Sequence, residues 1–190
     1  IYIKAQIRRE EARTACRYIG VKPDHVHFLD LPFYETGKVQ KGELSDKDIL
    51  KIIPLLEEVQ PHQIFVASDL ADPHGTHKVC LNAALAAIHE LKAILWMKEC
   101  RVWMYRGAWA EWEIDHIEMA VPISPEQLRK KRNSILKHQS QMESAPFLGN
   151  DERLFWQRAE ERNQATANLY NKLGLASYEA IEAFVEYKVI

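Results

Sequence analysis

Apolar positions recur at helical spacing along much of the chain and form short alternating or continuous runs between these stretches. The helical periodicity predicts helices over residues 7–19, 45–59, 76–91, 124–141, 155–173 and 177–187. The shorter runs predict strands over residues 25–32, 63–68, 101–106 and 116–121. Helices and strands therefore alternate, which is typical of an α/β domain built from crossover units around a parallel sheet.

This order predicts a single Rossmann-like, three-layer α/β domain over residues 1–190 with a mainly parallel sheet. The pattern opens on a helix, so we expect the first strand of the domain to be missing and the domain to be truncated at its N-terminus. The first strand of a doubly wound sheet usually lies centrally, and its loss would expose the apolar edges of its neighbours. We expect upstream residues, or self-association into a homo-oligomer, to cover them.

The composition narrows the class of partner. The 190 residues are 47% hydrophobic and 27% charged with a net charge of −2, which is typical of one soluble globular domain. No stretch approaches the length of a membrane span, and no excess of Lys and Arg favours a nucleic acid. We therefore expect a small-molecule ligand and neither a membrane nor a nucleic-acid partner. The three cysteines, an odd number, indicate reduced thiols in a cytoplasmic protein.

The segment "ADPHGTHKVC" carries the densest candidate chemistry. His74 and His77 are three residues apart where a strand gives way to a helix, so both imidazoles can project to one side as zinc ligands. Asp72 lies just upstream and could support such a site. The alternatives remain open: histidines satisfied by ordinary hydrogen bonds, and an aspartate that only caps a helix or forms a turn. In an open α/β sheet, loops that follow strands converge on one crevice, and this segment follows a strand.

A resemblance rests on four segments in a fixed order: "IRREEARTACRYIGV", "HFLDLPFYETG", "DPHGTH" and "KRNSILKHQSQ". Their order and spacing resemble the PIG-L/LmbE-like family of zinc N-deacetylases, which remove acetyl from N-acetylglucosamine-type groups. The segments "YRGAWAEW" and "GNDERLFWQRAEERN" add a likeness to the C-terminal portion of two-part proteins. In those proteins a glucosamine-6-phosphate deaminase-like half precedes an LmbE-like half, which would make that half a partner of this domain.

The resemblance implies roles for particular residues. The second histidine of the family's HxxH motif binds zinc, which falls on His77, and the first assists catalysis at the acyl group, which falls on His74. The Arg-x-x-Glu pair of the early helix falls on Arg8 and Glu11, with Arg8 reaching substrate and Glu11 supporting the site. An exposed helix arginine is the alternative for Arg8.

Further assignments concern the loops. Glu35 matches an acidic residue that accepts a sugar hydroxyl, although a solvated loop carboxylate is the alternative. His138, Ser140 and Gln141 match the H-x-S-Q signature, and we expect His138 and Gln141 to support the site. Independently of the resemblance, Arg106 at a strand end could hold a phosphate or carboxylate, or could form a rim salt bridge.

Two departures from the family pattern leave two hypotheses. Gly75-Thr76 stands where many relatives have Pro-Asp, and the first family motif, a His-Pro-Asp-Asp segment with zinc ligands and the general base, is absent. The first hypothesis is a zinc-dependent N-deacetylase-like domain, a hydrolase of the amide of an N-acetylglucosamine-type amino sugar, inactive as this fragment. The alternative is a non-catalytic module that binds a sugar phosphate for an attached glucosamine-6-phosphate deaminase.

Overall fold

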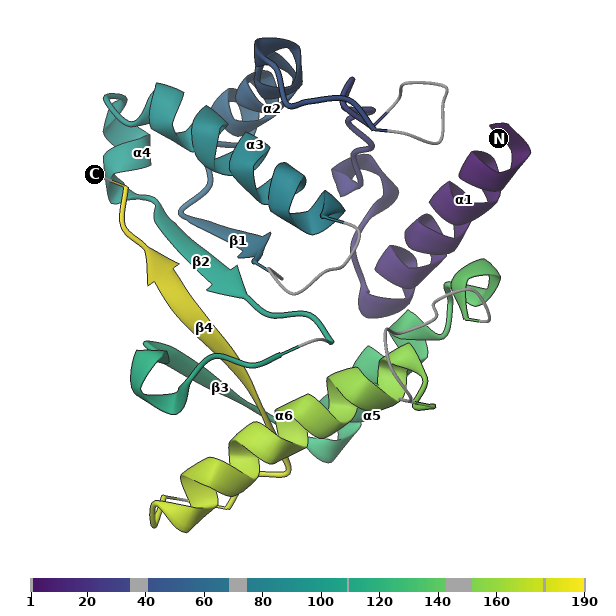
Figure 1. Cartoon of the computed structure of the whole chain (residues 1–190), viewed down its shortest axis with the longest axis vertical. Helices are drawn as coiled ribbons and strands as arrows, with labels where there is room; N and C mark the ends of the chain where they lie inside the picture. The colour runs from purple at the N-terminus through teal and green to yellow at the C-terminus, as the bar shows by residue number, and fades with distance from the viewer. Residues whose placement is uncertain are drawn as a thin grey trace. The chain divides into compact units, whose positions relative to one another are not determined.

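A computed structural model describes residues 2–34, 41–68, 75–108, 110–142, 152–175 and 177–189. Its helices and strands form an α/β fold, which confirms the predicted class (Figure 1). The chain divides into two compact units. The first unit comprises residues 1–28, 108–114 and 120–183, and the second unit comprises residues 29–107, 115–119 and 184–190.

The described strands belong to one mixed sheet in the order β1-β2-β4-β3. Their bounds are Gln63–Ala67 for β1, Arg101–Tyr105 for β2, Met119–Ile123 for β3 and Ala180–Tyr187 for β4. β1 and β2 are parallel, whereas β2 and β4 are antiparallel; Trp103 of β2 lies opposite Phe65 on one side and Glu186 on the other. The sheet is therefore less parallel than the sequence predicted.

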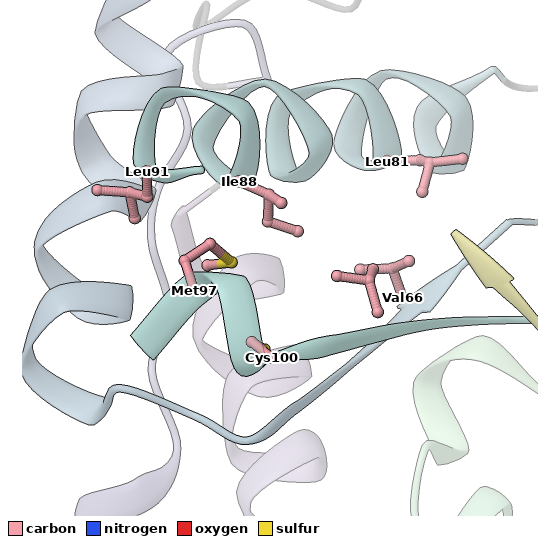
Figure 2. Close-up of a cluster of buried hydrophobic side chains, with 7 residues drawn as sticks. Val66, Leu81, Ile88, Leu91, Met97 and Cys100 are labelled. Carbon is pink, nitrogen blue, oxygen red and sulfur yellow. The ribbon is translucent and has the colours of Figure 1, made fainter. Parts of the chain in front are cut away.

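The second unit has a hydrophobic core between helices and the strands β1 and β2. Its helices are α2 (Asp46–Val59), α3 (Thr76–Leu91) and α4 (Leu95–Glu99). Figure 2 shows Leu81, Ile88 and Leu91 of α3 directed toward Val66 of β1 and Met97 of α4. These residues recur at helical spacing along α3 and bury one face of it, as the periodicity of the sequence predicted.

The first unit contains three long helices: α1 (Tyr2–Ile19), α5 (Pro125–Ile135) and α6 (Phe155–Lys172). α5 begins with Ser124 as N-cap, and its Oγ accepts a hydrogen bond of 3.2 Å from the N–H of Gln127. Pro125 follows at the first helical position, where its missing N–H costs nothing. α5 ends at Ile135, earlier than predicted, and a 3₁₀ turn follows at Gln139–Gln141.

A network of four charged side chains lies inside the first unit. Arg162, whose side chain is 8% exposed, donates to Glu111 at 3.1 Å and also pairs with Glu182, which Lys131 contacts as well. Asn163 accepts a hydrogen bond of 2.8 Å from Lys131. Burial raises the pKa of Glu111 and lowers the pKa of Lys131. Because two cations face two carboxylates, the buried charges compensate one another, and they join α5, α6 and β4 to the segment 108–114.

One predicted helix is a strand. Residues 177–187 were expected to be helical, but β4 occupies Ala180–Tyr187. Alanine and glutamate in this segment favour a helix, whereas Ile181, Phe184 and Val185 favour a strand. Pairing with β2 decides the outcome, because tertiary contacts override weak local propensity. The strand predicted over residues 116–121 is observed as β3, which begins later in the sequence, at Met119.

One predicted strand is irregular. Residues 25–32 were expected to form a strand, but the structure has a 3₁₀ turn at Pro23–His25 followed by backbone outside any ladder. Leu29 and Leu31 nevertheless pack against buried side chains of α2 and α3. The alternating pattern thus identified which side chains face inward, and no described strand provides the pairing that would make the segment a strand.

Replacing Ile88 with alanine tests the core of the second unit. Ile88 is 1% exposed, so we expect the substitution to lower the free energy of unfolding by about 2–5 kcal/mol through lost burial and a residual cavity. Leu50→Ala is the control, because Leu50 is 63% exposed and its loss should change stability by at most about 0.5 kcal/mol. Urea unfolding followed by circular dichroism measures both; equal effects would contradict this core.

Candidate functional site

The residues predicted for the site fall into three groups. Glu35, Asp72 and His74 lie outside the described residues, so their predicted roles stay predictions. The first unit contains Arg8, Glu11, His138 and Gln141. The second unit contains His77 and Arg106.

Glu11 joins α1 to the turn that follows α5. One of its carboxylate oxygens accepts from the N–H of Ser140 and the other from the hydroxyl of Ser140, each at 2.7 Å. Burial would raise the pKa of Glu11, but the two hydrogen bonds and the charges of His138 and Arg8 outweigh burial and lower it. Glu11 is therefore ionised at neutral pH and holds the 3₁₀ turn in place.

Arg8 and His138 bring two unpaired polar atoms to this cluster. Within the described ranges, neither the Nε of Arg8 nor the Nδ1 of His138 has a hydrogen-bond partner, although both atoms are buried. Buried polar atoms in proteins are nearly always paired, so such atoms are available to a ligand or to water. Arg8 and Glu11 lie one helical turn apart on α1, and this spacing places both on the face that meets the turn.

The anchoring of α1 against α5 explains why these residues meet. Asn133 of α5 donates a hydrogen bond of 3.1 Å to the hydroxyl of Tyr18, and the ammonium of Lys137 lies 4.9 Å from the centre of the Tyr18 ring. Gln141 ends the turn, where its N–H donates at 3.0 Å to the carbonyl of His138. We name Arg8, Glu11, His138 and Ser140 the polar cluster of the first unit.

Arg106 fixes the ends of two strands in the second unit. Its Nη1 donates at 3.0 Å to the carbonyl of Ser68, the residue that follows β1. The hydroxyl of the buried Ser68 donates in turn at 3.1 Å to the carbonyl of Tyr105. Arg106 therefore contacts a backbone carbonyl. Its predicted binding of a phosphate or carboxylate stays a prediction.

His77 lies on the first turn of α3 and is exposed. Gly75 precedes the helix as N-cap with φ of +65°, a left-handed conformation that disfavours other residues. Thr76, one of the two residues that depart from the family pattern, is hydrogen-bonded to the ammonium of Lys41. The departure therefore brings a cation to the first turn of α3.

Asp48 is a structural residue that the sequence analysis missed. It is fully buried and accepts from the N–H of Phe33 at 2.8 Å and from the N–H and hydroxyl of Ser45 at 2.9 and 2.8 Å. Burial would raise the pKa of Asp48, but these hydrogen bonds lower it. Asp48 thus ties together the two chain segments that flank Glu35. The S-x-x-D spacing of a capping box was the available signal.

The zinc ion implied by the resemblance does not fit the described residues. No group of three or more His, Cys, Asp and Glu side chains within them has an arrangement that could hold a metal ion. His77 is the only expected ligand that they contain, and one imidazole binds zinc weakly.

Among the described residues, no helix combines the length and apolar character needed to cross a membrane.

Comparison with known proteins confirms the resemblance to the PIG-L family. Residues 3–88 match the family model described as GlcNAc-PI de-N-acetylase. A Bacteroides thetaiotaomicron protein described as glucosamine-6-phosphate deaminase-like is 70% identical over 187 residues. The match covers 97% of this chain and 28% of that protein, so this chain spans less than a third of the relative's length.

Two solved structures share the fold. GalB, the 4-carboxy-2-hydroxymuconate hydratase of Pseudomonas putida KT2440, has a TM-score of 0.65 at 17% identity and covers 96% of this chain and 72% of its own. A deacetylase triple mutant from the teicoplanin biosynthetic pathway has a TM-score of 0.56 at 18% identity, covering 95% and 70%. A hydratase and a deacetylase thus share this fold, so function has to be argued from the site.

Glu11→Gln tests the polar cluster. At neutral pH we expect a loss of about 0.5–1.5 kcal/mol in the free energy of unfolding, because the charge-assisted hydrogen bonds to Ser140 weaken. The folded pKa lies below the unfolded value of about 4.3, so the contribution is complete above that value and disappears as pH falls through the folded pKa. Urea unfolding at pH 7 and at pH 3 measures this difference.

Glu10→Gln is the matched control, since Glu10 is an exposed carboxylate of the same helix that pairs with Arg13. A Glu11→Gln effect no larger than that of the control, or one that is as large at pH 3 as at pH 7, would contradict the role assigned to Glu11.

Proposed function

We propose that this chain is a deacetylase-like domain of the PIG-L type, which acts within a longer polypeptide on the acetamide of an N-acetylglucosamine-type amino sugar. The observation that carries the proposal is the polar cluster of the first unit. Its buried, unpaired Arg8 Nε and His138 Nδ1 lie beside the ionised Glu11, and Arg8 and Glu11 fall within the matched residues 3–88.

The cluster suits an oxygen-rich ligand. The Nε–H of Arg8 is a donor, and Nδ1 of His138 is a donor or an acceptor according to its tautomer. Sugar hydroxyls and an amide carbonyl offer the complementary oxygen atoms. In this proposal Arg8 binds the substrate, His138 and Gln141 support the site, and Glu11 holds the turn that carries them.

Roles are also proposed for individual residues of the second unit. His77 is proposed as one zinc ligand and His74 as the residue that stabilises the reacting acyl group, with Asp72 as support. Glu35 and Arg106 are proposed to bind hydroxyl and anionic groups of the substrate. Zinc would supply a Lewis acid for amide hydrolysis when bound, and in this proposal its other ligands lie outside the residues that the structure describes.

A second function is favoured by the contact between Lys41 and Thr76. This contact places a cation beside the N-terminus of the sixteen-residue helix α3, a combination that suits a phosphate group. A module that binds a sugar phosphate without hydrolysis, for an attached deaminase half, would use this feature.

Acetate release separates the two functions. The experiment uses a long chimaera, defined as the B. thetaiotaomicron relative in which its 187 matching residues are replaced by this chain. We expect the chimaera to release acetate from N-acetylglucosamine or its 6-phosphate, measured by an enzyme-coupled acetate assay. Saturable binding of glucosamine 6-phosphate to residues 1–190 alone, with no acetate release from the chimaera, would support the binding module instead.

Substitutions in the polar cluster test the roles proposed for Arg8 and His138. We expect Arg8→Lys and His138→Gln in the long chimaera to lower kcat/KM for acetate release by about 10- to 100-fold, because the first removes a polar contact to the substrate and the second removes support of the site. Arg9→Lys is the control, because Arg9 is the neighbour of Arg8 on α1 and stacks on Phe28, 5.5 Å from the ring centre. Full activity in both cluster variants would overturn the assignment.

Zinc binding tests the incomplete ligand set. We expect residues 1–190 alone to retain well under one equivalent of zinc after dialysis, because they contribute a single proposed histidine ligand among the described residues. The long chimaera should retain about one equivalent, measured by elemental analysis. Stoichiometric zinc and full acetate release from residues 1–190 would contradict the proposal that further ligands lie elsewhere.

A further inference from the structure

A pocket with a volume of about 320 Å³ lies at the amino end of β2, in the second unit. β4 runs antiparallel to β2, and Tyr187 at the end of β4 lies opposite Val102 near the start of β2. This pairing brings the last residues of β4 to the segment that joins α4 to β2 (Figure 1). The pocket therefore depends on β4, the strand that the sequence predicted as a helix.

This pocket is separate from the residues proposed for the deacetylase-like site. Arg101 is the first residue of β2 and lines the pocket, whereas Arg106 follows the other end of the strand and contacts Ser68. At about 3.3 Å per residue, the strand places about 16 Å between its two ends. Ligands of open α/β sheets bind beyond the carboxyl ends of parallel strands, so a pocket at the amino end of β2 needs an explanation of its own.

The wall of this pocket carries more positive than negative charge. Among the described residues its lining contains four cationic side chains and two carboxylates, although the whole chain has a net charge of −2. The cations are Lys92, Lys98, Arg101 and Lys188, and the carboxylates are Glu99 and Glu186. The wall therefore favours an anionic ligand.

Arg101 is held in one orientation by its neighbours. Its Nε and Nη2 donate to the carboxylate of Glu186 at 2.9 and 3.1 Å, and its guanidinium lies 4.4 Å from the centre of the Trp103 ring. Hydrogen bonds from Arg101 and Lys188 lower the pKa of Glu186 to about 2. The charge of Glu118 also acts on Arg101, but its carboxylate accepts from the N–H of Glu186 at 2.6 Å. The Nη1 of Arg101 thus keeps two N–H donors for a ligand.

The rest of the pocket combines a lysine with aromatic and apolar surface. Lys98 is exposed near the end of α4 and forms no ion pair within the described ranges. The hydroxyl of Tyr187 shares a hydrogen bond of 2.8 Å with Nε2 of His89 on α3, which fixes the Tyr187 ring at the wall. The buried Met97 and Cys100, at the junction of α4 and β2 in Figure 2, supply apolar lining.

We propose that this pocket binds a small phosphate monoester of the size of a hexose phosphate. A dianionic phosphate balances the excess of two positive charges on the wall, whereas a single carboxylate would balance one. The phosphate binds Lys98 and the Nη1 of Arg101, and the carbon skeleton lies against Tyr187. A pocket of about 320 Å³ is at the lower end of the range for small-molecule sites, which excludes larger ligands.

A nuclear magnetic resonance titration of residues 1–190 locates the ligand. We expect glucosamine 6-phosphate to shift the amide resonances of residues 98–103 and 186–189 saturably, with a Kd of about 0.1–1 mM. Inorganic phosphate should bind there at least about tenfold more weakly, because it lacks the carbon skeleton, and glucosamine should cause no shift. Equal shifts with sulfate would indicate non-specific anion binding and would overturn the proposal, as would shifts confined to other residues.

Substitutions distinguish this pocket from the N-terminus of α3. Arg101→Gln and Lys98→Gln should each weaken binding at least about tenfold in the same titration. Lys47→Gln is the matched control, because Lys47 is an exposed lysine of α2 outside the pocket lining, and it should leave the Kd unchanged. If Lys41→Gln abolishes binding while both pocket variants retain it, the phosphate binds beside Thr76 and the proposal is wrong.

The test does not depend on deacetylase activity, because no acetate is measured. Lys98→Gln alone decides the outcome if Arg101→Gln does not fold, since Lys98 is exposed and forms no ion pair within the described part of the chain. If residues 1–190 do not fold alone, calorimetry compares the long chimaera with its Lys98→Gln variant. The variant should lose one bound equivalent of glucosamine 6-phosphate at ligand concentrations near the Kd, and identical isotherms would overturn the proposal.

Discussion

The backbone of a buried strand must find hydrogen-bond partners on both sides, and this constraint governs the fold. β2 meets it, with β1 parallel on one side and β4 antiparallel on the other. Residues 180–187 become a strand because β2 needs that second neighbour, whereas residues 29–31 remain outside any described ladder. The two errors in predicting strands therefore share one cause: local sequence reports which side chains are buried, but pairing depends on segments far along the chain.

The helices could be predicted because their evidence is local. Ser124, Pro125 and the apolar spacing of α3 mark helix starts and buried faces within a few residues. The candidate site was predictable in part for the same reason: one helical turn separates Arg8 from Glu11, and family motifs identified His138. The hydrogen bonds of Glu11 to Ser140 span 129 positions, and no periodicity reports a contact at that distance.

Two carboxylates illustrate how the same chemistry serves different ends. Asp48 and Glu11 both accept backbone and hydroxyl hydrogen bonds, and in both the hydrogen bonds outweigh burial to keep the group ionised. Asp48 joins Phe33 to Ser45 in the second unit. Glu11 instead fixes a turn beside two unpaired polar atoms, so that a structural anchor and a candidate binding surface coincide in the first unit.

The charge network of the first unit restricts how this protein can evolve. Arg162 and Lys131 balance Glu111 and Glu182, so a neutral residue at any one position leaves an opposite charge without its partner in a largely buried setting. Substitutions in the network are then tolerated when they occur in pairs, for example when a cation and its carboxylate partner are replaced together. An alignment of relatives should display these four positions as covarying columns.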